Sequence, residues 1–95
     1  RLSDTVADAQ FLNLPTRLAK KLLTLSKSDG RDVPEGREIQ VKLSQGELAD
    51  LVATTRESIN KQIGIWREDG ILSMESGRVL LHRIAALEEI AASNR

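Results

Sequence analysis

The segment from Ser44 to Gly70 constrains the fold of this chain more than any other part of it. Ser44 and Glu47 have the spacing of a capping box, in which each side chain accepts a hydrogen bond from the other residue's backbone N–H. Apolar residues follow the cap and stop near Val52. The sequence therefore predicts a short helix between residues 44 and 52 that begins at a well-defined point.

A second helix is predicted directly after a two-residue turn. Thr55 is placed to cap its start, and Gly70 is placed to end it. The apolar positions repeat with the i, i+4, i+7 period of one buried face and are Ile59, Ile63 and Trp66. Two helices joined by so short a turn predict a helix-turn-helix over about residues 44–70.

The flanking patterns predict the rest of a mainly α domain with a small antiparallel sheet. Apolar residues at helical spacing indicate three more helices, over residues 3–14, 15–26 and 84–92. Glycine, proline and charge over 28–37 predict a loop, and alternation over 38–43 predicts a half-buried strand.

A β-hairpin is predicted over about residues 71–82, where two short strands flank Ser76-Gly77. A hairpin that follows a helix-turn-helix is typical of a winged helix-turn-helix, in which the hairpin is the wing. We therefore expect residues 1–95 to form one winged helix domain.

Composition excludes several kinds of chemistry. The 95 residues can bury only one modest core. There is no cysteine and only one histidine, and no nucleophile stands beside a base, so we predict no metal, no cofactor and no enzymatic activity in this domain. No apolar run reaches the roughly 20 residues that cross a bilayer, and we expect a cytoplasmic protein.

The first two turns of the second predicted helix carry side chains suited to DNA. In the major groove, arginine can donate two hydrogen bonds to guanine and glutamate can accept one from cytosine. We predict that four residues contact bases: Arg56, Glu57, Asn60 and Lys61. In the alternative interpretation these side chains are merely solvated, and Glu57 complements the helix dipole.

The string from Leu43 to Lys61 closely resembles the helix-turn-helix of the cyclic-AMP receptor protein and fumarate–nitrate regulator superfamily. Residues 14–23 and 66–72 are similar to the helix ahead of that motif and to its continuation into the wing. The resemblance implies the DNA-binding half of a homodimeric transcription regulator. It also implies an upstream domain, outside this chain, that dimerises and senses a cyclic nucleotide or another small effector.

The resemblance further implies a double-stranded, pseudo-palindromic DNA site and RNA polymerase as a possible further partner. Phosphate contacts are expected from hydroxyl, amide and guanidinium groups of both helices and the wing, namely Thr55, Ser58, Ser44, Gln45 and Arg78.

Four positions depart from the family pattern. Gly46 replaces a common glutamate inside the first helix, which lowers helix propensity and removes a side chain from a position that can face phosphate. Ala53 stands where glycine is frequent, so a left-handed backbone is not expected in the turn. Gly64 replaces a frequent basic residue, which limits contacts beyond Lys61. Lysine at position 61 lacks the two-pronged geometry of arginine, which predicts looser base specificity there.

Net charge leaves one alternative open. The 14 basic and 14 acidic residues cancel, whereas DNA-binding domains are often basic. A winged helix that binds only protein is therefore the alternative function. A positive face over Arg56, Lys61 and Arg78 would favour DNA.

Overall fold

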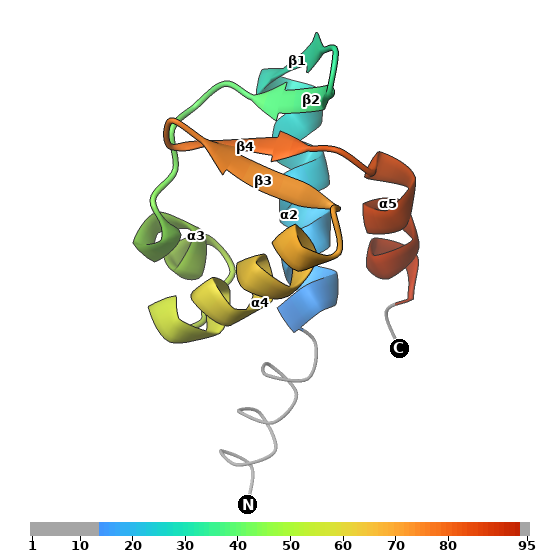
Figure 1. Ribbon diagram of the computed structural model, residues 1–95. Coiled ribbons are helices and arrows are strands. Elements are labelled where there is room, and N and C mark those ends of the chain that lie inside the picture. Colours follow the sequence, from blue (N-terminus) through green and yellow to red (C-terminus); the bar gives the residue numbers. More distant parts are fainter. Residues whose placement is uncertain (1–13, 94–95) are drawn as a thin grey trace, which may run out of the picture.

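The computed structural model describes residues 14–93 and opens on a central helix. Helix α2, Leu14–Asp29, runs through the middle of the domain (Figure 1). Pro15 lies in its first turn, where the missing N–H has no helical partner to lose. The helix continues three residues beyond the predicted end at residue 26. The helix predicted over residues 3–14 lies outside the described residues, apart from Leu14.

A β-hairpin follows α2, and the loop predicted over residues 28–37 is therefore wrong. Strand β1, Gly30–Val33, pairs with strand β2, Gly36–Ile39. The predicted strand over residues 38–43 begins earlier and ends at Ile39. Pro34 occupies the hairpin turn, so this proline marks a turn between strands rather than a loop.

Pairing with a distant strand explains why β2 lies where it does. In the antiparallel register of β2 with β4, Arg37 pairs with Leu81 and Glu38 with Leu80. Gly36 has φ +151°, and a Cβ at this position would lie 2.0 Å from the Leu81 carbonyl oxygen. Only glycine allows so close an approach of the two backbones.

The predicted wing hairpin is confirmed. Strands β3, Leu72–Glu75, and β4, Arg78–Leu81, are antiparallel, and the sheet order is β1-β2-β4-β3. Ser76 and Gly77 have φ of 53° and 80°, and two positive φ angles are the geometry of a type I′ hairpin turn.

Both helices of the predicted helix-turn-helix are present. Helix α3, Gln45–Leu51, begins with the capping box, in which the Glu47 N–H donates to Ser44 Oγ over 3.0 Å and the Ser44 N–H donates to Glu47 Oε1 over 2.8 Å. Helix α4, Arg56–Glu68, is followed by Gly70 at φ +73°. The Ile71 N–H then donates to the Trp66 carbonyl, which completes the predicted glycine cap.

The turn between α3 and α4 differs from the expectation. Ala53 has φ 57°, so the left-handed backbone is present without glycine. The Thr54 N–H donates to the Ala49 carbonyl over 2.9 Å, and the Arg17 guanidinium donates to the Val52 carbonyl. These contacts fix the reversal of the chain, so packing imposes a conformation that the residue type disfavours.

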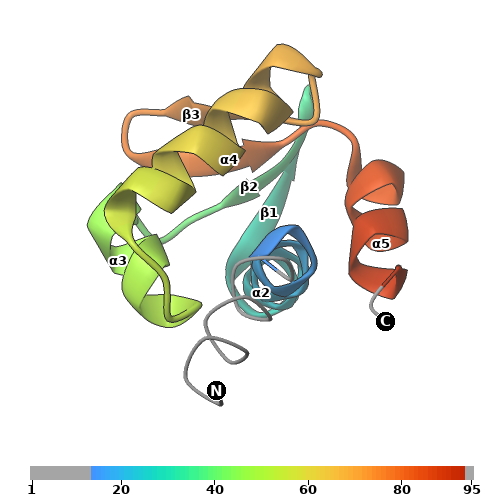
Figure 2. The ribbon, with the colours of Figure 1, turned by 90° about the horizontal axis from the view of Figure 1, so that it is seen from below.

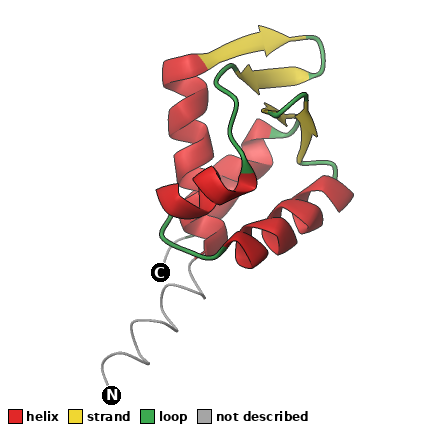
Figure 3. Cartoon of the chain, turned by 90° about the vertical axis from the view of Figure 1, so that its left-hand side faces the viewer, coloured by secondary structure: helices red, strands yellow, loops and turns green. Residues whose placement is uncertain are grey.

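The core lies where the helices meet the sheet. Helix α5, Ile84–Ala92, has the predicted bounds and packs along one side of α2, while α3 and α4 lie on the other side (Figure 2). Leu18, Leu22, Ile39 and Ile63 have no exposed surface. Figure 3 shows the sheet at one end of α2, beside the helix pair. The predicted winged helix-turn-helix, mainly α with a small antiparallel sheet, is confirmed.

Candidate nucleic-acid interface

Helix α4 has one buried and one open face. Ile59 and Ile63 have no exposed surface, and Trp66 is 3% exposed. The apolar stripe therefore anchors the helix to the core, and its opposite side faces solvent along the full length of the helix.

The structure brings the four predicted base-contacting residues together on that open face. Arg56, Glu57, Asn60 and Lys61 are all exposed and all lie in the first two turns of α4. None of them forms an ion pair with another residue of the described range 14–93. Such a polar, convex helix start has the shape and the hydrogen-bonding groups to enter a major groove.

After Lys61, the open face of α4 presents a glycine and an exposed apolar side chain. Gly64 has no atom within 4 Å of the position a Cβ would take, so bare backbone is presented there. Ile65, which the sequence pattern placed on no face, is 47% exposed. It lies four residues after Lys61, on the same side of the helix.

Two hydroxyls are joined at the start of α4. Thr55 Oγ1 accepts from the Ser58 N–H over 3.1 Å and donates to Ser58 Oγ over 2.9 Å. The cap predicted at Thr55 is thereby confirmed. The Ser58 hydroxyl keeps its own proton and can donate it to a phosphate beside the unpaired N–H groups of the helix start.

The start of α3 offers a second set of polar groups. Ser44 is exposed and Gln45 is half-buried. The Ser44 oxygen already accepts within the capping box, which leaves its hydroxyl proton for an external partner. Gly46, between Gln45 and Glu47, contributes no side chain to this surface.

The wing is tied to the segment that leads into α3. The Arg78 side chain, half-buried, donates from Nε to the Gln40 carbonyl over 2.7 Å, and the Leu43 N–H donates to the Gly77 carbonyl over 3.0 Å. Arg78 therefore helps to position the wing. The sequence analysis missed Lys42, an exposed cation whose side chain lies beside Gly77 at the wing tip. Its polar position in the alternating segment is the signal that could have found it.

Although the net charge is zero, basic and acidic side chains line different surfaces of the domain. Arg17, Lys20 and Lys21 line a groove beside the turn between α3 and α4. Glu35, Glu38 and Glu75 line a separate hollow of about 310 Å³ on the sheet, with His82.

His82 is bonded within the sheet. Its Nε2 lies 2.9 Å from Ser73 Oγ, and its Nδ1 lies 3.1 Å from the Glu35 carbonyl oxygen. Within residues 14–93, no group of three histidine, aspartate or glutamate side chains is arranged to hold a metal ion. The helices of this same range are also too short or too polar to cross a bilayer.

Comparison with known proteins agrees with this geometry. The family model for the Crp-like helix-turn-helix domain matches residues 16–90. The CRP-like cAMP-activated global transcriptional regulator of Mycobacterium tuberculosis is 32% identical over 81 residues, which cover 85% of this chain and 36% of that protein. The anaerobic regulatory protein of Bacillus subtilis is 37% identical over 67 residues, which cover 70% of this chain and 28% of that protein.

A solved structure has the same fold. The CO-dependent transcription factor CooA from Carboxydothermus hydrogenoformans superposes with a TM-score of 0.80 at 27% sequence identity, over 85% of this chain and 38% of that one. The chain thus spans about a third of the length of the regulators it matches.

Proposed function

The chain belongs to the family of Crp-like helix-turn-helix domains, and from this membership we propose that it binds double-stranded DNA sequence-specifically as the output domain of a transcription regulator. The observation that carries the proposal is the open face of α4, where Arg56, Glu57, Asn60 and Lys61 are exposed together. The alternative of a winged helix that binds only protein gains no support from the family match.

In the proposed complex, the first two turns of α4 lie in the major groove. The Arg56 guanidinium donates to guanine, the Glu57 carboxylate accepts from cytosine, and the Asn60 amide pairs with adenine. Lys61 reaches a guanine or a phosphate, without the two-pronged geometry of arginine. In this proposal the chain acts by binding DNA and catalyses no reaction.

Phosphate contacts surround this base-reading face. Ser58 and Thr55 lie at the start of α4, and Ser44 and Gln45 lie at the start of α3, where unpaired backbone N–H groups also favour anions. Arg78 adds a contact from the wing, limited by the bond of its Nε to Gln40. These contacts fix the position of the domain on the duplex.

We further propose that the complete regulator works in the cytoplasm as a homodimer on a pseudo-palindromic site. If the two recognition helices enter successive major grooves, the half-sites lie about 34–36 Å apart. The relatives that are ligand-responsive suggest that a domain outside this chain binds a small effector, such as a cyclic nucleotide, and shifts the population able to dock. RNA polymerase is the proposed partner at the promoter.

Selection of bound sites from random duplex DNA, followed by measurement of affinity for the selected site, tests the proposal. Arg56→Ala should weaken specific binding by about 10- to 100-fold and relax the preference at one base pair. Arg67→Ala is the matched control, since it removes an exposed arginine from the last turn of the same helix and should change affinity by less than about threefold. Failure to enrich any sequence, or equal affinity of Arg56→Ala and the parent, would refute it.

A further inference from the structure

A basic groove runs between α2 and the turn that joins α3 to α4. It has a volume of about 420 Å³, and the residues that line it are Arg17, Lys20, Lys21, Thr24, Leu51, Val52 and Ala53. Three of these seven carry a positive charge and none carries a negative one. The base-reading face of α4 contributes none of its side chains to this groove.

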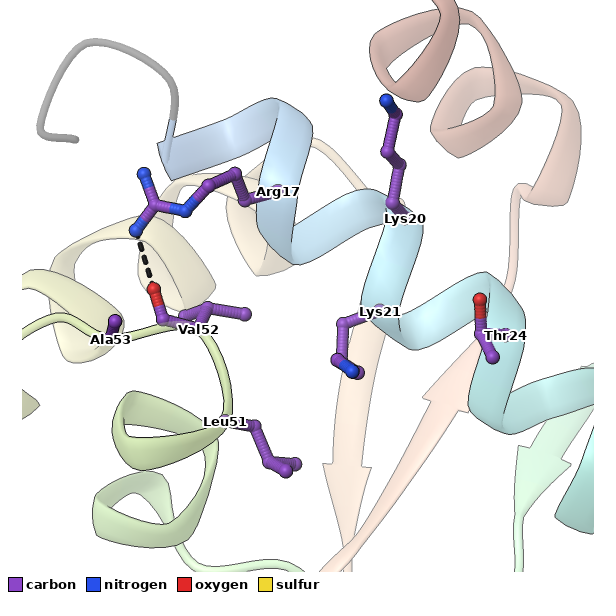
Figure 4. A pocket seen from close by; sticks show the side chains of 7 residues that line it. All are labelled: Arg17, Lys20, Lys21, Thr24, Leu51, Val52 and Ala53. Atoms are coloured by element: carbon purple, nitrogen blue, oxygen red, sulfur yellow. Dashed lines mark hydrogen bonds between the residues drawn. The ribbon is translucent and has the colours of Figure 1, made fainter. Parts of the chain in front are cut away.

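The wall formed by α2 is cationic. Figure 4 shows the Lys21 side chain projecting into the groove, whereas the Lys20 side chain points away from Leu51 and Ala53. Neither lysine forms an ion pair with another residue of the range 14–93. The Arg17 guanidinium is held across one end of the groove by its hydrogen bond to the Val52 carbonyl.

The wall formed by the turn is apolar. Leu51 is 44% exposed, and its side chain points toward α2 across the groove (Figure 4). It is one of only three large apolar side chains within residues 14–93 that are exposed to this extent. Ala53 continues the apolar wall. A ligand that fits the groove therefore carries negative charge and covers an apolar side chain as well.

DNA bound to the open face of α4 does not satisfy both requirements. The fully buried Leu22 of α2 and Ile63 of α4 place the core between these two helices, so their solvent faces point in different directions. None of the seven residues that line the groove belongs to α4. A phosphate backbone also offers no apolar group to cover Leu51, whereas an acidic peptide with leucine or a similar side chain does.

We propose that this groove docks an acidic peptide segment of a partner protein that carries an apolar side chain. The apolar side chain packs on Leu51 and Ala53, and a neighbouring carboxylate accepts hydrogen bonds from the Lys21 ammonium group. This docking is independent of the proposed DNA binding, because it uses none of the base-reading residues. The groove can thus bind a partner protein while the domain is bound to DNA.

Fluorescence anisotropy with two synthetic peptides tests the proposal. The probe is a fluorescein-labelled helical peptide of glutamate, alanine and leucine, and its isosteric control carries glutamine at every glutamate. The glutamate peptide should bind, with an affinity that falls as salt rises, and the glutamine peptide should bind at least about tenfold more weakly.

Substitutions then locate the site. Lys21→Gln and Leu51→Ala should each weaken binding of the glutamate peptide by about threefold, and the double variant by about tenfold. Lys27→Gln, an exposed lysine of the same helix that does not line the groove, should leave affinity within about 1.5-fold of the parent. Affinity for duplex DNA should be unchanged in the Lys21→Gln variant, and thermal unfolding checks that each variant folds.

Four results would overturn the proposal. They are no binding of the glutamate peptide, equal binding of the two peptides, an equal loss for Lys27→Gln and Lys21→Gln, and weaker duplex binding by Lys21→Gln with unchanged peptide binding. The last result would assign the groove to the DNA backbone. Loss of DNA binding in Arg56→Ala with peptide binding intact would separate the two functions.

Discussion

Replacing Ala53 by glycine should stabilise the domain, although this substitution usually destabilises a protein. Ala53 has φ 57° in the turn between α3 and α4. A left-handed conformation costs a residue with a Cβ about 1–2 kcal/mol. Glycine adopts this conformation freely, and Ala53 is exposed, so the lost methyl group removes no buried packing.

The unfolded state offsets part of this gain. Glycine has more conformational freedom in the unfolded chain, which reduces the free energy of unfolding by about 0.4–1 kcal/mol. The difference of the two ranges is about 0–1.6 kcal/mol, and we expect Ala53→Gly to increase the free energy of unfolding by about 0.8 kcal/mol. For a domain of this size, that increase corresponds to a rise in Tm of about 2–8 °C.

Urea unfolding followed by circular dichroism measures the change. The midpoint should rise while the slope m stays constant, because the surface exposed on unfolding is the same. Ala85→Gly is the matched control, since Ala85 is exposed and lies in α5 with helical backbone. The free energy of unfolding of Ala85→Gly should be lower by up to about 1 kcal/mol. A lower midpoint for Ala53→Gly, or equal losses for the two variants, would refute the reasoning.

Other substitutions probe the start of α4, the sheet and the wing. Thr55→Ala removes the cap of α4 and should lower the free energy of unfolding by about 1 kcal/mol, whereas Thr55→Ser should retain it. Gly36→Ala places a Cβ 2.0 Å from the Leu81 carbonyl oxygen and should lower the free energy of unfolding by about 2–3 kcal/mol or more. Gly64→Ala lies in open space within α4 and should raise the free energy of unfolding by up to about 1 kcal/mol. Urea midpoints that rank these two variants the other way would contradict the assigned geometry. Arg78→Ala should weaken binding to all duplexes alike and make the affinity less dependent on salt concentration. A loss of affinity confined to one base position would contradict a phosphate contact.

Where the controlling interactions are local, the sequence predicted the structure closely. The capping box at Ser44 and Glu47, the cap at Thr55 and the glycine after α4 each depend on hydrogen bonds that span a few residues. The wing turn at Ser76-Gly77 is equally local, since the backbone angles of these two residues reverse the chain between β3 and β4. The open face of α4 then follows from helical periodicity once its apolar stripe is buried.

The hairpin between α2 and α3 could not be found in this way. Residues 30–39 are rich in glycine and charge, which is typical of a loop. They form strands because β2 pairs with β4, some forty residues further along the chain, and the close approach at Gly36 permits it. A sheet contact over that distance leaves no periodic pattern in residues 30–37, and only Glu38 and Ile39 fall within the alternating segment that predicted a strand.

The sequence by itself determined where the helix-turn-helix begins and ends and which side chains of α4 face outward, because caps and apolar stripes act within one or two helical turns. Only the tertiary structure decided the left-handed backbone at Ala53, the attachment of Arg78 to Gln40 and the groove beside Leu51. Each of these arises where segments distant in the chain meet. Packing of one segment against another outweighs the preferences of a single residue.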